Sequence, residues 1–214
     1  MVNFRVFGRW CWLGDSFSAP LVLTAAEAWV TTQLKRLSGN FLARRVVTQS
    51  GNTLNTISIY NPHWALNQAQ LHGQDLSGIL LPGETKVWAA DLLQAAIPTL
   101  VRETDAPWVI GGDFNLSTTF DAWKPGKTSN RTFLDRMARS SLTECLCAMQ
   151  GQLTPTFRNP SRGKEIKHQI DHLFVTRELA DRLVSCQTGS QERVFESVPA
   201  LSDHLPIVAT YSNG

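Results

Sequence analysis

Three short fragments of the sequence carry side chains that can act on an anionic substrate. Asp113 and Asn115 follow one apolar stretch, Asp171 opens another, and Asp203 and His204 come just before a third. A carboxylate can take a proton from water, an amide can donate a hydrogen bond to an anion, and an imidazole can do either. Because the neighbouring apolar, β-branched stretches predict buried strands, we expect the five side chains to meet at one rim of a sheet.

Taken one at a time, the fragments also have ordinary structural explanations. An aspartate after two glycines, as at Asp113, most often belongs to a turn, because glycine supplies a positive φ and aspartate caps its own backbone. An Asp-His pair is often part of a solvated loop, and His204 alone can be a satisfied, partly buried histidine. A site is favoured because the three fragments occur in this order, each beside an apolar strand.

The three fragments in this order resemble the endonuclease/exonuclease/phosphatase family, which contains abasic-site endonucleases, DNase I, inositol-phosphate phosphatases and bacterial sphingomyelinases. The resemblance extends from about Pro20 to Tyr211, and its motifs are specific for the family but not for the substrate. It implies a DNase I-like α/β (α+β) fold, in which two packed, mostly antiparallel sheets form a β-sandwich flanked by helices. The active site is then expected at one edge of the sandwich.

The resemblance also implies a role for each side chain in phosphodiester hydrolysis. Asp113 orients and deprotonates the attacking water, while Asn115 donates a hydrogen bond to a phosphate oxygen; an extended backbone would point both the same way. His204 binds the phosphate, and Asp171 accepts a hydrogen bond from its other ring nitrogen. Asp203 and Asp113 are the implied metal contacts, and carboxylate ligands favour Mg²⁺ or Mn²⁺.

A strand that ends in Tyr60 before a proline-containing loop resembles another family segment, whose polar side chains touch the phosphate. Tyr60 matches this segment best, His63 is a second phosphate-binding candidate, and Asn61 is expected to serve the turn. His172 should face the opposite side of its strand from the catalytic carboxylate, which predicts a structural role. Most of the seven tryptophans are expected in the core, but Trp64 follows this motif directly and is a candidate substrate contact.

The sequence departs from the family pattern near its start. Family members begin with a strand carrying Asn and a second strand ending in Gln-Glu, whose glutamate is the principal metal ligand, and neither segment is found here. Asp15 and Glu27 do not match that glutamate, so we assign the metal role to neither. Either the chain begins late within a longer protein, which we favour, or metal binding is naturally weakened. We therefore expect one domain over residues 1–214, incomplete at its N-terminus.

A basic segment around one phenylalanine precedes the strand of Asp171. Arg158, Arg162 and Lys164 lie in it and are candidate contacts to the phosphate backbone of a nucleic acid. A solvated loop without a ligand explains the same residues equally well.

The bulk composition places few limits on the substrate. A formal charge of +2 and a pI near 8.4 are only mildly basic, so affinity for a polyanion has to come from a local patch. The four cysteines fit neither a disulfide framework nor a zinc site, and no signal peptide or membrane span is recognisable. These features predict a cytoplasmic protein with reduced thiols, and nothing indicates a protein partner.

Apolar periodicity predicts the elements that must position these residues. A helix is expected over 84–103, shortened or kinked by Pro98, and a second is expected to begin at Thr132 with Asp135 as a capping partner. The strands are expected at 20–25, 44–49, 55–60, 107–112, 169–176 and 207–211.

These observations favour a metal-dependent phosphodiesterase that acts on DNA, as an endonuclease or exonuclease. One alternative is a phosphatase or phospholipase of the same family, acting on an inositol phosphate or a phospholipid headgroup. A second alternative is a catalytically silent module that binds phosphate.

Overall fold

Two β-sheets and seven short or medium helices make up the described part of the chain. The computed structural model describes residues 2–7, 10–13, 17–20, 39–48, 51–72, 76, 79–81, 84–122, 129–159 and 165–212. The larger sheet has the strand order β3 (Phe17–Pro20), β4 (Phe41–Val47), β5 (Thr53–Tyr60), β6 (Trp108–Asp113), β10 (Asp171–Thr176) and β7 (Leu142–Glu144). The smaller sheet has the order β11 (Leu183–Thr188), β12 (Ile207–Tyr211), β1 (Val2–Phe7) and β2 (Trp10–Leu13).

A short hairpin and the helices complete the described fold. The hairpin joins β8 (Phe157–Arg158) to β9 (Ile166–His168). The helices are α2 (Gln68–Leu71), α3 (Ala89–Glu103), α4 (Thr118–Asp121), α5 (Ser129–Arg139), α6 (Cys145–Gln150), α7 (Arg177–Ala180) and α8 (Gln191–Phe195). No helix among the described residues is both long enough and apolar enough to cross a bilayer.

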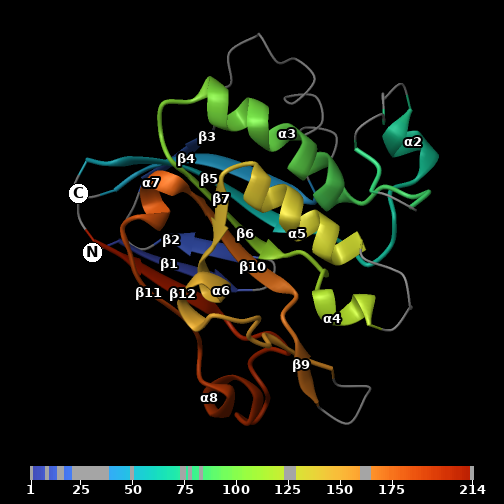
Figure 1. Cartoon of the computed structure of the whole chain (residues 1–214). Helices are drawn as coiled ribbons and strands as arrows, with labels where there is room; N and C mark the ends of the chain where they lie inside the picture. Colours follow the sequence, from blue (N-terminus) through green and yellow to red (C-terminus); the bar gives the residue numbers. More distant parts are fainter. Residues whose placement is uncertain are drawn as a thin grey trace.

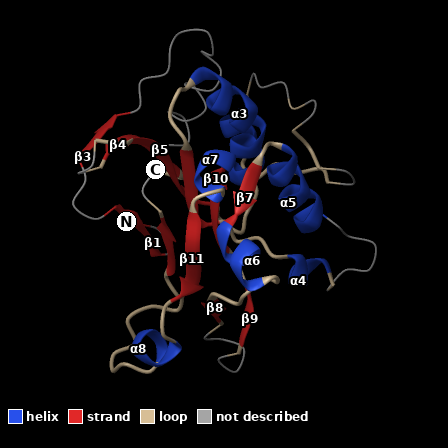
Figure 2. Cartoon of the chain, turned by 60° about the vertical axis from the view of Figure 1, so that its left-hand side comes forward, coloured by secondary structure: helices blue, strands red, loops and turns tan. Residues whose placement is uncertain are grey.

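The central strands β6 and β10 of the larger sheet are buried on both faces, as their apolar runs predict. On one face, α3 and α5 cover the sheet, and their apolar side chains pack with Ile57 and Ile110 in the first core cluster (Figure 1). On the other face, Val109 and Leu173 pack with Ile207 of the smaller sheet in the second cluster. Figure 2 shows β1 and β11 of the smaller sheet on one side of β10 and β7, and α3 and α5 on the other side. The predicted two-layer sandwich with flanking helices is confirmed, and its described pairs are antiparallel except β5 with β6.

Strand alternation decides which side chains of β10 reach the interface between the sheets. Leu173 and Val175 belong to the cluster between the sheets, whereas Phe174 belongs to the cluster under the helices. Side chains two residues apart share a face, so Asp171 points toward the smaller sheet and His172 points toward the helices.

Most of the predicted strands are present, with small shifts at their ends. The predicted hairpin is β4 with β5, and the strands predicted at 107–112, 169–176 and 207–211 are β6, β10 and β12. Of the strand predicted at 20–25, the structure describes only β3, which ends at Pro20.

Two helix predictions need correction. Helix α3 begins at Ala89, where the Asp91 carboxylate accepts a hydrogen bond from Trp88 N at 2.9 Å, and it continues through Pro98. Helix α5 begins at Ser129 instead of Thr132, because the Asp121 carboxylate caps its first turn from outside the helix. Neither boundary follows from apolar periodicity alone.

The start of the chain also differs from the expectation. Strand β1 lies in the smaller sheet, paired with β12, so a first strand is present in the sandwich. Its Val6 pairs with Ile207 near the predicted site, while Asn3 pairs with Thr210 toward the other end. Asp15 and Glu27 lie outside the described residues.

Candidate functional site

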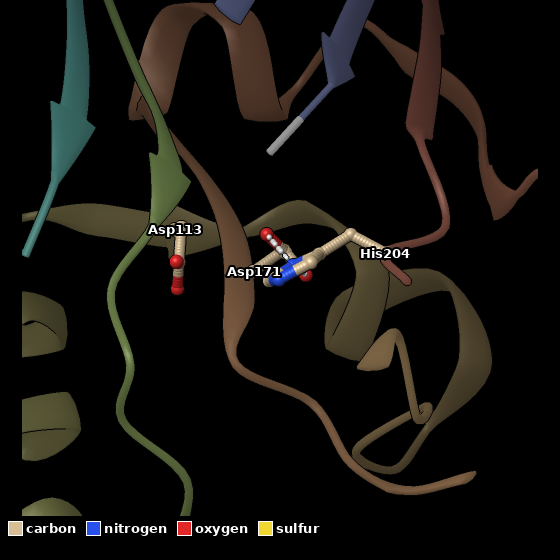
Figure 3. A group of neighbouring side chains, drawn as sticks. All are labelled: Asp113, Asp171 and His204. Carbon is tan, nitrogen blue, oxygen red and sulfur yellow. Dashed lines mark hydrogen bonds and ion pairs between the residues drawn. The ribbon is translucent and has the colours of Figure 1, made fainter. Parts of the chain in front are cut away.

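Two buried aspartates lie side by side on neighbouring strands of the larger sheet. Asp113 ends β6, Asp171 begins β10, and the two residues are direct partners in the antiparallel ladder (Figure 3). Asp113 is 5% exposed and Asp171 is 1% exposed. Like charges placed directly opposite each other destabilise a sheet. Such a pair is typical of a site that binds positive charge, because without one the repulsion between the two carboxylates would destabilise the fold.

Gly112 allows Asp113 to occupy this place. Its φ is +147°, and a Cβ atom added there would lie 2.0 Å from the carbonyl oxygen of Ile59 in the neighbouring β5. Only glycine tolerates both the backbone conformation and the close approach. The two glycines before Asp113 are therefore part of a strand, although Asp113 also caps the backbone after it, as the turn explanation expects, by accepting a hydrogen bond from Asn115 N.

His204 supplies a positive charge beside the two carboxylates. Its Nδ1 lies 2.9 and 3.1 Å from the two carboxylate oxygens of Asp171, which is the predicted hydrogen bond. Burial lowers the pKa of His204, but the bond to Asp171 and the charges of Asp171, Asp113 and Asp203 outweigh it and raise the pKa to about 9. At neutral pH the ring is an imidazolium that donates from Nδ1 to Asp171 and keeps Nε2–H for another acceptor.

The side chain of Asp203 lies on the Nε2 side of His204. One carboxylate oxygen is 3.9 Å from Nε2, and the side chain is 55% exposed. Its backbone is held in place, because the main-chain oxygen of Asp203 accepts a hydrogen bond from Arg158 N at 2.9 Å.

Thr156 joins the strand of Asp171 to the loop of His204. Its buried hydroxyl accepts hydrogen bonds from the backbone N of Ile170 and Asp171, both at 3.2 Å. Its carbonyl accepts a bond from Leu205 N at 2.7 Å. The sequence carried no signal for this role, because the partners of Thr156 come from two distant segments.

Asn115 contacts Asp113 by a route that differs from the prediction. Its φ is +47°, a left-handed conformation that asparagine tolerates better than most residues, so the backbone between the two is not extended. Its Nδ2 nevertheless donates to Asp113 Oδ2 at 3.1 Å, and its backbone N donates to Asp113 Oδ1 at 2.9 Å. The same Nδ2 group donates to the carbonyl of Asn61 at 2.8 Å.

Asn61 does more than serve a turn. Its buried Nδ2 group donates to the carbonyl of Phe114 at 2.7 Å, and its Oδ1 accepts a bond from Ala90 N at 3.0 Å. Its backbone N donates to the carbonyl of Asp113 at 2.8 Å. Asn61 therefore fastens the ends of β5 and β6 to the first turn of α3. It is a positioning residue that sequence reasoning undervalued.

The remaining predicted residues of this segment lie at the rim. Tyr60 ends β5 opposite Asp113 in the parallel ladder and is half-buried. His63 is exposed and lines the cavity described below, and its ring packs edge-on against Trp64, with 4.7 Å between ring centroids.

His172 has the structural position predicted for it. Its Nε2 lies 3.0 Å from the carbonyl oxygen of Leu116, and its ring packs against Phe114 and Phe174 on the helix side of the sheet. It is fully buried, on the opposite face from Asp171.

A cavity of about 480 Å³ opens beside Asn115, with three aromatic side chains, Trp88, Phe120 and Phe157, in its wall. The first turns of α3 and α5 also line it. Several backbone donors there already have acceptors: Asn61 accepts from Ala90 N, Asp91 accepts from Trp88 N just before α3, and Asp121 accepts from two N–H groups of α5. The cavity therefore suits a ring with apolar faces better than a second phosphate.

The described part of the basic segment is a hairpin whose side chains contact the protein. The Arg158 guanidinium lies over the ring of Phe195, 5.1 Å from its centroid, and donates to the Phe195 carbonyl. His168 hydrogen-bonds Thr119 at 2.7 Å. Arg162 and Lys164 lie outside the described residues.

The donor set fits a hard divalent cation. Ligand atoms of Asp113, Asp171 and His204 all lie within 4.8 Å of one another, a grouping found within the described residues. His204 is a poor ligand, because its Nδ1 is engaged by Asp171 and its ring is protonated at neutral pH. The carboxylate oxygens of the grouping are the better match to a metal such as Mg²⁺, and Asp203, the other predicted metal contact, is not part of this grouping.

The solved structures that share the fold include a phosphatase bound to DNA and an AP endonuclease. One is the 3′ phosphatase NExo from Neisseria, bound to a product DNA hairpin. It is 16% identical to this chain with a TM-score of 0.55, and the match covers 80% of this chain and 65% of NExo. The AP endonuclease LMAP from Leishmania major is 15% identical with a TM-score of 0.54, and the match covers 82% of this chain and 55% of LMAP. The APE2 catalytic domain from Xenopus laevis is 14% identical with a TM-score of 0.58, and the match covers 98% of this chain and 75% of the APE2 domain.

The chain thus spans 55% to 65% of the length of the first two enzymes. At these identities the likeness concerns the fold. No curated protein sequence matches the chain closely enough to count as a relative.

The sequence itself matches a family profile over most of its length. The profile of the endonuclease/exonuclease/phosphatase family covers residues 20–204, which include all three fragments of the site. The chain therefore belongs to the endonuclease/exonuclease/phosphatase family.

Proposed function

We propose that this protein is a divalent-metal-dependent phosphodiesterase that cleaves DNA. The observation that carries the proposal is the hydrogen bond between His204 and Asp171 beside the buried Asp113, from three separate segments of the chain. This bond supports the proposal because phosphodiester hydrolysis requires a cationic donor and a carboxylate base close together. The family profile and the DNA-processing enzymes of the same fold support the substrate class.

Each residue has a defined task in this reaction. Asp113 takes a proton from the attacking water, and its orientation is held by two hydrogen bonds from Asn115. The Nε2–H group of His204 donates to a phosphate oxygen and stabilises charge that develops in the transition state. Asp171 keeps the ring of His204 in the orientation that presents Nε2.

Asn115 and Tyr60 are the further proposed contacts to the phosphate. The amide of Asn115 exchanges one of its two internal bonds for a phosphate oxygen. Tyr60 lies at the end of β5 with its backbone paired opposite Asp113, and His63 lies farther out on the same rim.

A cation held by carboxylate oxygens of Asp113 and Asp203 would neutralise the phosphate and the leaving alkoxide. Mg²⁺ or Mn²⁺ is the proposed ion, because the ligands are oxygen atoms. The cytoplasm remains the proposed compartment, and Cys145, Cys147 and Cys186 are free cysteines.

The proposal is tested with three substrates under three metal conditions. The purified protein is incubated with supercoiled plasmid DNA, an inositol phosphate or a choline phospholipid, each with Mg²⁺, Mn²⁺ or EDTA. We expect plasmid nicking with either metal and none in EDTA. Hydrolysis of only the inositol phosphate or the phospholipid would reassign the substrate. Nicking in EDTA would refute the metal requirement. DNA binding without cleavage would identify a catalytically silent module.

A further inference from the structure

An exposed tryptophan lies at the rim of the site. Trp64 is 58% exposed, and no other phenylalanine, tyrosine or tryptophan whose side-chain burial the structure describes is exposed. Tryptophan is highly buried in most proteins, because its indole carries a large apolar area. An indole left in solvent beside a catalytic centre indicates a surface that a ligand covers.

The backbone that carries Trp64 is fixed at both ends. On one side Asn61 is buried and hydrogen-bonded to Asp113, Phe114 and α3. On the other side Leu66 is buried, and its backbone N donates to the Val87 carbonyl at 2.8 Å. The exposed tip between these anchors is His63 and Trp64, whose rings pack edge to face. The indole is therefore presented by a tethered loop, and a T-shaped contact with His63 can cover at most one of its two faces.

Trp64 is also close to the predicted position of the phosphate. It lies three residues after Asn61, whose carbonyl accepts a hydrogen bond from Asn115. Three residues of extended chain span at most about 11 Å, and successive bases of one DNA strand are spaced about 3.4 Å apart along the helix axis. The indole can therefore reach a base within about three nucleotides of the phosphate held at Asn115.

We propose that Trp64, supported by His63, is a stacking platform for an unpaired nucleobase next to the scissile phosphate. This inference rests on the proposed phosphodiesterase function and narrows its substrate to DNA with a single-stranded, frayed or extruded nucleotide. Stacking on an indole requires an open base face, and in an intact duplex both faces of each base are covered by neighbouring base pairs. Aromatic platforms of this kind accept any base, because every base has a π-face.

The test measures binding to two single strands that differ only in their bases. Fluorescein-labelled oligothymidylate and an abasic oligomer of equal length are titrated with protein in EDTA, and Kd is read from anisotropy. Trp64→Ala should weaken binding to oligothymidylate about 10-fold to 100-fold, and binding to the abasic oligomer by less than about 2-fold. Trp64→Phe should recover most of the affinity for oligothymidylate, since a phenyl ring still stacks.

Val184→Ala is the matched control, because Val184 is 55% exposed, also apolar, and lies in β11 near the end that pairs with Tyr211, away from His204. This variant should bind both oligomers as the wild type does. Equal weakening of both oligomers by Trp64→Ala, or no weakening of either, would overturn the platform. If the wild type cleaves DNA and Trp64→Ala shows no base-dependent loss, only the platform fails; if the platform is found without cleavage of any phosphodiester, only the proposed function fails.

Discussion

Replacement of Asn61 by alanine should damage both the stability of the fold and the geometry of the site. The substitution removes two side-chain hydrogen bonds, one to the Phe114 carbonyl and one from Ala90 N. Phe114 and Ala90 are at most 1% exposed, so their main-chain groups would be left buried without these partners. Each such loss costs about 1–3 kcal/mol, so the free energy of unfolding should fall by about 2–6 kcal/mol.

The same change should lower kcat, because Asn61 also holds the segment that orients Asn115 and Asp113. A displacement of about 1 Å at a catalytic group can cost about 100-fold in rate. Urea unfolding gives the stability, and plasmid nicking measured well below the unfolding midpoint gives kcat. If alanine prevents folding, Asn61→Asp keeps an acceptor for Ala90 N and loses only the donor to Phe114.

Asn55 provides the matched control at the opposite end of β5. It is fully buried, donates one hydrogen bond to the Ala106 carbonyl at 3.1 Å, and its Oδ1 has no partner among the described residues. Asn55→Ala should therefore cost stability but leave kcat of the folded protein unchanged. Wild-type stability in Asn61→Ala, or equal effects of the two variants on kcat, would refute the positioning role of Asn61.

Two further predictions follow from the structure, and a third follows from the basic segment of the sequence. Gly112→Ala should destabilise the fold by more than about 4 kcal/mol, because the new Cβ would meet backbone at a positive φ, whereas Gly39→Ala has open space and should change little; equal melting temperatures would contradict this. Burial raises the pKa of Asp91 from 3.8 to about 6, so the native state binds more protons than the unfolded state between these values, and the contribution of Asp91 to stability should fall by about 2 kcal/mol as pH rises from 4 to 6. Asp91→Asn should remove that part of the slope in urea unfolding at different pH values, and an unaltered slope would count against the buried carboxylate. Neutralising Arg162 and Lys164 should flatten the salt dependence of DNA binding, and an identical slope would favour the solvated-loop alternative.

The strands and the three catalytic fragments could be predicted because their signals are local. Apolar stretches with alternating faces identified β6, β10 and β12, and the same alternation separated Asp171 from His172. Once those strands pair, Asp113 and Asp171 meet without further information.

The residues that sequence reasoning missed act on backbone groups of distant segments. Asn61 and Thr156 bind carbonyl and N–H groups that only the folded chain brings near them. The start of α5 depends on Asp121, which lies before the helix and outside any capping pattern within it. The left-handed backbone of Asn115 likewise could not be read from a two-residue spacing.

The initial rate of plasmid nicking by Asp113→Asn in saturating Mg²⁺ tests the central claim most directly. Asparagine keeps the size of the side chain and removes the base, so the rate should fall by about 100-fold or more while the urea midpoint shows a folded protein. A folded Asp113→Asn protein that nicks DNA at the wild-type rate would contradict the assignment of Asp113 as the base, and with it the mechanism proposed for this site.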